Sequence, residues 1–208
     1  MRKSCLSFLF VAAALAAAGC ASSANAPADA KPAEPKQGGA AAAPGPMAPY
    51  SLMDVTEAVA VVHPTTGNAA KGVVRFTQTA DGLHVVADIE GLKPNAKHAF
   101  HIHEFGDCTS GDGKSAGAHY NPEGHPHAGP DTSMRHAGDL GNLETDAKGV
   151  AHYDRIIGGL TVGGERDPVI GRSVIIHAGT DDFTTQPTGN AGDRVGCGVI
   201  GVAKPAAK

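Results

Sequence analysis

The sequence predicts an all-β domain, an antiparallel sandwich or barrel. Short segments alternate between apolar and polar residues with a period of two, which is typical of half-buried strands. The 28 glycines and 14 prolines suit short strands joined by turns and loops. We find no convincing amphipathic helix of about ten or more residues. These observations favour strands over helices throughout the domain.

The strands are expected in order from a β-branched run that begins at Val55. Further strands are expected at 74–77, 83–90, 98–104, 149–155, 171–177 and 195–202. The clearest is 83–90, where Leu83 opens a regular apolar alternation. Two connections are long, 106–139 and 178–193, and connections of that length are usually functional or disordered. The first is full of metal-ligating residues, so we expect it to be functional.

The N-terminus has the layout of a secretory signal peptide, which we place at 1–20. Arg2 and Lys3 precede an apolar run from Leu6 to Ala18. This run is shorter than the roughly 20 apolar residues of a comfortable membrane span. The signal therefore indicates export.

Small residues before Cys20 resemble the cleavage box of bacterial lipoproteins, in which the cysteine is lipidated. Ala17 stands where such boxes usually carry leucine, and the alternative is an ordinary signal cut between residues 21 and 26. The lipoprotein interpretation predicts a periplasmic protein that is attached to the outer membrane through Cys20.

Residues 21–49 are mainly Ala, Pro and Gly, and they lack large apolar side chains to bury, which predicts a disordered tether. Residues 50–204 suit one domain, and 205–208 form a short tail. The formal charge is −4, or −6 after the signal with Arg2 and Lys3 is removed. The chain has no basic stripe, which argues against a nucleic-acid partner.

The cysteines fit an exported protein. Cys5 leaves with the signal, and lipidation would occupy Cys20. Cys108 and Cys197 then remain, and two cysteines in an oxidising compartment most simply form a disulfide.

Histidines gather on two expected strands. His101 and His103 are two residues apart, so both rings lie on one face while Phe100 and Ile102 lie on the other. We therefore expect a chelating pair on the outside of the sheet. His177 ends a second strand.

Three or four imidazoles around one ion suit copper, the divalent first-row metal that nitrogen donors bind most tightly. His127, His136 and Asp139, with one more histidine, make a four-ligand set of the kind that closed zinc sites use.

Five blocks in order resemble the copper,zinc superoxide dismutases of the exported bacterial type. They are Phe-His-Ile-His-Glu-Phe-Gly at 100–106, Gly-Ala-His-Tyr-Asn-Pro at 117–122, His-Ala-Gly-Pro at 127–130, Arg-His-Ala-Gly-Asp-Leu-Gly-Asn at 135–142 and Gly-Asn-Ala-Gly-Asp-Arg-Val-Gly-Cys-Gly-Val-Ile-Gly at 189–201. The resemblance covers essentially the whole domain. It implies a Greek-key β-sandwich or barrel of immunoglobulin-like architecture, with one copper and one zinc per subunit.

The resemblance also implies roles for individual residues. The implied copper ligands are His101, His103, His119 and His177. The implied zinc ligands are His119, His127, His136 and Asp139, so that His119 bridges both ions. Asp181 matches the aspartate that links a copper histidine to a zinc histidine. Arg194 matches the arginine beside the copper, and Cys108 and Cys197 match the disulfide that steadies it.

Some neighbouring residues compete for these roles. His125 lies two residues before His127, and Asp182 follows Asp181; the family pattern favours His127 and Asp181. His98 matches a histidine that packs beside the copper strand. For three further histidines we expect solvated or core positions: His63, His84 and His152.

The implied activity is the disproportionation of superoxide to dioxygen and hydrogen peroxide, with His119 and Arg194 as catalytic residues. The substrate partner is the superoxide anion, and family members occur as monomers and as homodimers. The alternative is an exported copper- and zinc-binding protein on the same scaffold without turnover. A purely adhesive β-sandwich would give no reason for the spaced histidines.

Overall fold

The computed structural model describes residues 51–204. The predicted signal peptide at 1–20, lipidation at Cys20, the tether at 21–49 and the tail at 205–208 lie outside the described residues. Within 51–204 the longest helices are single 3-10 turns, so no helix there has the length and apolarity needed to cross a membrane.

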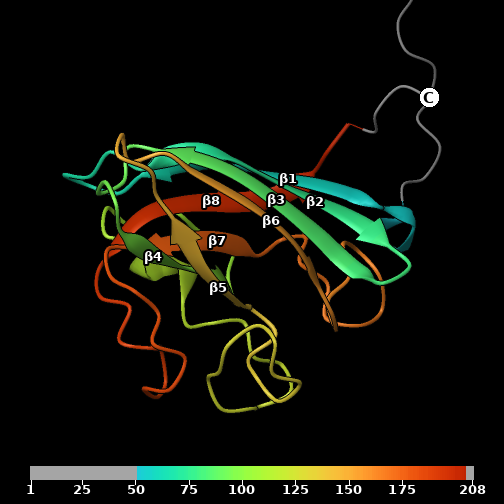
Figure 1. The fold of residues 1–208 in the computed structure, drawn as a ribbon. Helices are drawn as coiled ribbons and strands as arrows, with labels where there is room; N and C mark the ends of the chain where they lie inside the picture. The colour runs from blue at the N-terminus through green and yellow to red at the C-terminus, as the bar shows by residue number, and fades with distance from the viewer. Residues whose placement is uncertain (1–50, 205–208) are drawn as a thin grey trace, which may run out of the picture. The chain divides into compact units, whose positions relative to one another are not determined.

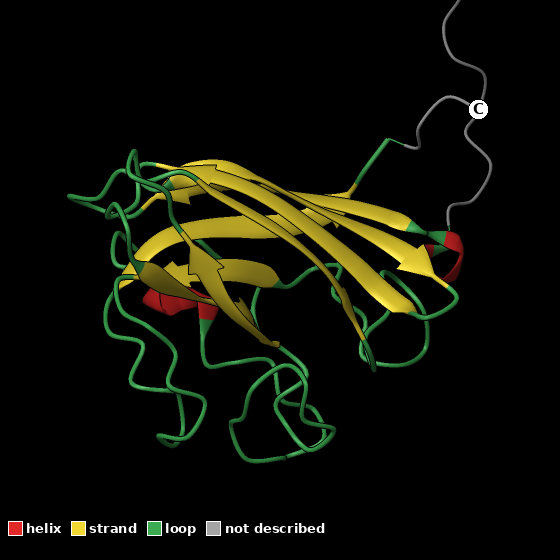
Figure 2. Ribbon diagram, viewed as in Figure 1, coloured by secondary structure: helices red, strands yellow, loops and turns green. Residues whose placement is uncertain are grey.

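The described residues form one antiparallel sheet of eight strands (Figures 1 and 2). The strands are β1 (Glu57–Pro64), β2 (Lys71–Thr79), β3 (Gly82–Glu90), β4 (Lys97–His103), β5 (Asp139–Glu144), β6 (Ala151–Ile157), β7 (Ser173–His177) and β8 (Arg194–Val202). Two 3-10 turns, η1 (Leu52–Asp54) and η2 (Lys114–Ala116), are the helical elements of this range. The all-β prediction is confirmed.

The strand order is β5-β4-β7-β8-β1-β2-β3-β6, and the sheet curls into a nearly closed barrel. Figure 1 shows β1, β2, β3 and β6 as one curved layer, and β4, β5 and β7 in the layer opposite. The two ends of the order meet where the Tyr153 hydroxyl on β6 donates to the Leu140 carbonyl on β5, at 2.7 Å. The chain crosses between layers after β3, after β5 and after β6, in keeping with the expected Greek-key topology.

Alternation builds the core. In β3, Leu83, Val85, Ala87 and Ile89 are at most 1% exposed, while the residues between them are half-buried or exposed. Across the register, Val85 pairs with Phe76 of β2, whose side chain is also fully buried. The period of two in the sequence thus translates directly into one apolar inner face.

Strand β4 departs from this pattern because both of its faces are buried. Phe100 and Ile102 face the core, as predicted, and His101 and His103 lie on the opposite face. The expectation that this pair stands outside the sheet is correct, yet both rings are fully buried. The two long connections, 104–138 and 178–193, lie together over this side of the barrel (Figure 1). The site is therefore enclosed by loops.

Strand β5 was not expected, and its first residue, Asp139, falls at the end of the connection predicted at 106–139. It contains a glycine with positive φ, Gly141 (96°), and it has no β-branched residue. The register with β4 shifts between Phe100 and His101, which leaves Leu140 as an extra residue. A bulged strand of this kind breaks the alternation that identifies strands in a sequence.

Candidate metal centre

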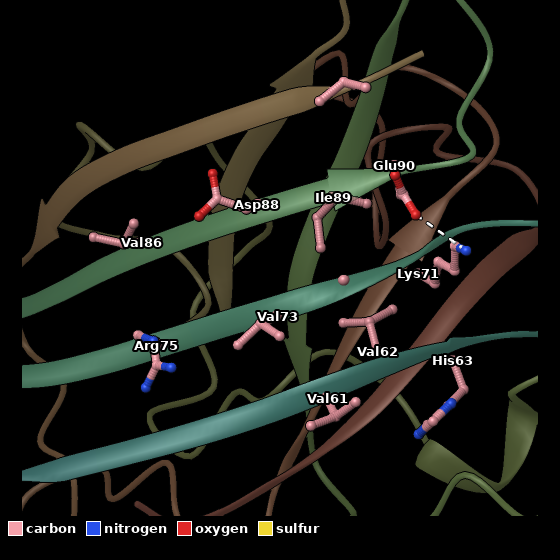
Figure 3. Close-up of a pocket in the computed structure, with 12 residues that line it drawn as sticks. Val61, Val62, His63, Lys71, Val73, Arg75, Val86, Asp88, Ile89 and Glu90 are labelled. Atoms are coloured by element: carbon pink, nitrogen blue, oxygen red, sulfur yellow. Dashed lines mark ion pairs between the residues drawn. The ribbon is translucent and has the colours of Figure 1, made fainter. Parts of the chain in front are cut away.

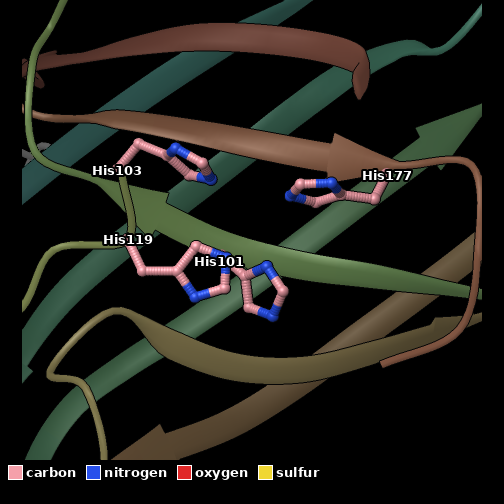
Figure 4. A group of neighbouring side chains, drawn as sticks. All are labelled: His101, His103, His119 and His177. Atoms are coloured by element: carbon pink, nitrogen blue, oxygen red, sulfur yellow. The ribbon is translucent and has the colours of Figure 1, made fainter. Parts of the chain in front are cut away.

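Four histidines from three segments converge on one point (Figure 4). His101 and His103 come from β4, His177 ends β7, and His119 comes from the first long connection. Each offers one ring nitrogen, and these nitrogens all lie within 4.8 Å of one another. All four residues are at most 4% exposed. The strand pairing of β4 with β7 fixes three of the four rings.

The inward nitrogens of this group are free to bind a cation. The Nδ1 atoms of His103 and His177 lie 2.9 and 3.1 Å from the Gly117 and Gly192 carbonyls. A carbonyl only accepts, so each Nδ1 carries the proton and each Nε2 presents a lone pair. These Nε2 atoms, with Nε2 of His119 and Nδ1 of His101, are buried without a hydrogen-bond partner in the described part of the chain. Four unpaired lone pairs suit a bound copper ion.

A second group adjoins the first and shares His119 with it. Its members are His119, His127, His136 and Asp139. Asp139 Oδ1 lies 3.0 Å from Nδ1 of His119, 3.0 Å from Nδ1 of His127 and 3.3 Å from Nδ1 of His136. Three imidazoles and one carboxylate form a four-ligand set that suits tetrahedral zinc. His119 faces this group with Nδ1 and the first group with Nε2.

Asp181 connects the two groups through hydrogen bonds. Its Oδ2 lies 2.8 Å from Nε2 of His101, and its Oδ1 lies 2.8 Å from Nε2 of His127. Because a carboxylate only accepts, both Nε2 atoms carry a proton, and Nδ1 is the nitrogen that each ring offers to its group. The side-chain amide of Asn142 holds Asp181 in turn, accepting from its backbone N–H at 2.8 Å and donating to its carbonyl at 3.0 Å.

Electrostatics keep the first group neutral. Burial lowers the pKa of His119 to about 4 and the pKa of His177 to about 3. Burial also holds the pKa of His103 well below its usual value, and the neighbouring Arg194 charge lowers it further. Neutral imidazole is the form that binds a metal. These ligands are therefore ready to bind at neutral pH.

In the second group, contacts between histidines and carboxylates set the protonation of each member. Burial alone would lower the pKa of His127, but hydrogen bonds to Asp139 and Asp181 outweigh it and raise the value to about 9. Burial would raise the pKa of Asp139, yet hydrogen bonds from the three histidines hold it far below its usual range. The Asp139 carboxylate is thus ionised throughout the physiological pH range.

Arg194 lies beside the first group. Its Nη1 and Nη2 donate to the carbonyls of Gly113 and Gly117, both at 2.7 Å. Gly117 also accepts from His103, so one carbonyl positions both side chains. The guanidinium is half-buried, and burial lowers its pKa from the ordinary arginine value. Fixed positive charge therefore stands next to the four histidines.

Comparison with known proteins identifies the family. A family model described as copper/zinc superoxide dismutase matches residues 70–200. The chain belongs to the copper/zinc superoxide dismutase family. A superoxide dismutase [Cu-Zn] of Neurospora crassa is 45% identical over 72% of this chain and 100% of its own length. One from Paramecium bursaria Chlorella virus 1 is 44% identical over 74% of this chain and 84% of its own. An extracellular superoxide dismutase [Cu-Zn] of Drosophila melanogaster is 48% identical over 64% and 76%.

The disulfide of this superoxide dismutase domain is confirmed. Cys108 and Cys197 are bonded, and they join the first long connection to β8 across 89 residues of sequence. Cys197 lies three residues after Arg194 on the same strand. The disulfide therefore connects the loop that carries Gly113 and Gly117 to the strand that carries Arg194.

The residues that competed for roles lie apart from the two groups. The His125 ring lies 3.3 Å from the Arg135 carbonyl and 3.4 Å from Glu123. Asp182 is exposed and accepts from the backbone N–H groups of Thr184 and Thr185 at 2.9 and 2.8 Å. Neither belongs to a metal group.

The other histidines of the superoxide dismutase domain also lie outside both groups. His98 is buried, and its Nδ1 lies 2.8 Å from the His177 carbonyl, so it packs beside the first group without belonging to it. His84 and His152 pair with Asp154 and Asp88 on the outer surface. His63 is exposed.

Two contacts of the site could not be found from the sequence. The Gln186 side chain makes two hydrogen bonds to the backbone of His127, and Asn142 does the same for Asp181. An amide side chain that bonds to the backbone of a distant residue occupies no characteristic position in the sequence relative to that residue. Asn142 lies inside a block that resembles the family, whereas Gln186 carries no signal in the sequence.

One of three surface pockets opens onto the metal groups. A pocket of 400 Å³ is lined by His119 and His136 together with Arg172 and Thr188. Another, of 670 Å³, is lined by Arg194 and Lys114. A third, of 610 Å³, is a groove over β1, β2 and β3 (Figure 3). None of the residues of the metal groups lines that groove.

Proposed function

We propose that this protein disproportionates superoxide, with a copper ion in the first group and a zinc ion in the second. Its membership of the copper/zinc superoxide dismutase family supports the reaction. The observation that carries the proposal is the sharing of His119 by two buried groups, one of four imidazoles and one of three imidazoles and a carboxylate. A site for a single metal would not need the second group.

The assignment of metals follows from the donors. Copper ranks highest among first-row divalent ions for nitrogen ligands, which favours it at His101, His103, His119 and His177. Zinc has no redox chemistry and readily takes a tetrahedral set that includes a carboxylate, which favours it at His119, His127, His136 and Asp139. The zinc group would then hold the first long connection in place.

A bound copper ion supplies the one-electron chemistry by which two superoxide anions and two protons become one dioxygen and one hydrogen peroxide. The residues of the chain supply position, charge and protons. His119 offers Nε2 toward the first group while Nδ1 faces Asp139. With Nε2 uncoordinated, His119 would hold a proton there and could donate it to the substrate anion.

Arg194 binds and orients the anion in this proposal. Its guanidinium is fixed by two backbone carbonyls and lies close enough to His103 and His177 to lower the pKa of both. Fixed positive charge beside a partly buried site attracts a small anion even when the whole chain is negative. The connection 178–193 contains no lysine or arginine, so Arg194 acts with little help from its own loop.

The test compares Arg194→Ala with Arg75→Ala, which removes an exposed arginine from the outer face of β2. Superoxide consumption and the content of both metals are measured together. Arg194→Ala is expected to lose roughly tenfold to a hundredfold in rate while it keeps both metals, since steering by local charge has that size. Arg75→Ala should match the parent. A variant that loses copper would contradict the role of Arg194, and a fully loaded parent without turnover would favour a metal carrier.

We further propose that the protein is an exported bacterial member. The signal is cleaved before Cys20, and the lipidated Cys20 then attaches the protein to the outer membrane on its periplasmic side, with 21–49 as a tether and 50–204 as the enzyme. The apolar run before Cys20 and the small residues beside it support this. Lipid labelling of the parent and of Cys20→Ser tests the anchor. Labelling that persists in the variant contradicts it. The enzyme acts as a monomer or a homodimer.

A further inference from the structure

The side chain of Gln186 holds the backbone of a residue in the second group. Its Oε1 accepts from the His127 N–H at 2.8 Å, and its Nε2 donates to the His127 carbonyl at 2.8 Å. Both polar groups of the His127 backbone are thus satisfied by one amide, 59 residues away in sequence. A neutral amide presents one acceptor and one donor at the same end of the side chain, which this pair of hydrogen bonds requires.

The same segment also holds the ring of His127. Asp181 accepts from Nε2 at 2.8 Å, five residues before Gln186. Gly189 packs over this hydrogen bond so closely that a Cβ there would lie 2.0 Å from Asp181 Oδ1 and 2.6 Å from His127 Nε2. Residues 181–189 therefore fix His127 at its backbone and at the ring nitrogen that faces away from the metal group.

We propose that Gln186 is a positioning residue for the zinc group, whose amide sets the direction in which His127 presents Nδ1 to Asp139. The inference rests on the proposed function, because it takes the second group to be the zinc site. Without the Gln186 amide, the backbone of His127 would be free to change its orientation within the loop. The His127 ring would then turn about its remaining hydrogen bond to Asp181. Gln186 thus acts through His127 and does not bind the metal.

A second amide–backbone pair in the same site, Asn142 with Asp181, supports this role. Asn142, within β5, holds the Asp181 backbone by the same two-bond pattern. Asp181 and His127 are bonded to each other by their side chains. The Asp181 backbone is held by an amide from β5, and the His127 backbone is held by an amide from the connection that carries Asp181. Asn142 fixes the backbone of Asp181 only, and Gln186 fixes the backbone of His127, the other member of the pair.

The experiment compares Gln186→Met with the parent and with Gln78→Met. Methionine keeps the length of the side chain and removes both hydrogen-bonding groups. Gln78 is the matched control, because its Oε1 accepts from the Val162 backbone N–H at 3.0 Å at a position that belongs to neither metal group. Zinc affinity of the metal-free proteins is measured by competition with a chromophoric chelator. The visible spectrum of Co²⁺ in the zinc group reports the ligand geometry.

Gln186→Met is expected to bind zinc about tenfold more weakly, the lower end of the range for groups that orient ligands, because Gln186 is exposed to competing water. Its Co²⁺ spectrum should change, and Gln78→Met should keep parental affinity and spectrum even if it unfolds more easily. Parental affinity and spectrum in Gln186→Met would overturn the inference. An equal loss in both variants would make the effect one of general stability and would overturn it too. A parent that binds no zinc would instead overturn the proposed function.

Discussion

Asp181→Asn tests how one carboxylate sets the protonation of two rings. The carboxylate accepts from Nε2 of both His101 and His127, at 2.8 Å each, so Nδ1 is the nitrogen that each ring offers to a metal. Asparagine has the same shape but one accepting oxygen, and its NH₂ group only donates. One ring must then face a donor, and it moves its proton from Nε2 to Nδ1. That ring loses the nitrogen with which it binds metal.

The size of the effect follows from what such contacts contribute. Replacing a group that orients a metal-bound histidine typically lowers affinity 10- to 100-fold, about 1.4–2.7 kcal/mol. We expect one of the two groups in Asp181→Asn to lose at least this much, while the other keeps an acceptor for its ring. Zinc and copper affinities of the metal-free variant, measured separately by chelator competition, should therefore diverge from the parent unequally.

Asp182→Asn is the matched control for this variant. Asp182 is the adjacent residue, it is exposed, and it caps a turn without contacting either ring. Both affinities of this control should equal those of the parent. If Asp181→Asn also kept both parental affinities within about twofold, the assignment of protons to Nε2 of His101 and His127 would be refuted.

Two further predictions concern stability. Replacing Cys108 and Cys197 by serine should lower the free energy of unfolding by about 4 kcal/mol, because the disulfide closes a loop of 89 residues. Urea denaturation measures this loss, and an unchanged midpoint would contradict the prediction. The metal-free protein should lose stability as pH falls from 6.5 toward 4. Burial lowers the pKa of His119 to about 4 and of His177 to about 3 in the folded protein. In this pH range the unfolded chain therefore binds protons that the folded chain does not, and protonation favours unfolding. His127, with its pKa raised to about 9, contributes stability that is lost as pH rises from 6.5 toward 9. Thermal midpoints from pH 4.5 to 9 test both limbs, and a midpoint that stays constant below pH 6.5 would contradict the first.

The sequence predicted the barrel well where burial is one-sided. The apolar alternation that begins at Leu83 placed β3 correctly, because solvent covers one face of that strand. Alternation could not show that β4 is covered on both faces, since the cover comes from connections distant in sequence. It also missed β5, where the glycine at 141 and the bulge at Leu140 interrupt the period.

The metal groups were predicted from sequence blocks that resemble a family, and the structure brings the same residues together in two clusters. Spacing alone predicted one face for His101 and His103, but it could not choose between His125 and His127. That choice depends on which ring the loop turns inward. The amide contacts of Gln186 and Asn142 depend entirely on how two loops meet, which no local pattern in the chain records.

The Gly117 peptide has a consequence for how this enzyme can vary. Its carbonyl accepts hydrogen bonds from both the His103 ring and the Arg194 guanidinium. Its φ of 78° disfavours residues other than glycine, and the Glu104 and Phe105 side chains leave no room for a Cβ. A shift of this one peptide would turn the His103 ring and displace the Arg194 guanidinium at the same moment. If His103 binds copper and Arg194 attracts the anion, as proposed, metal affinity and anion capture are mechanically tied, and selection cannot adjust one through this segment without changing the other.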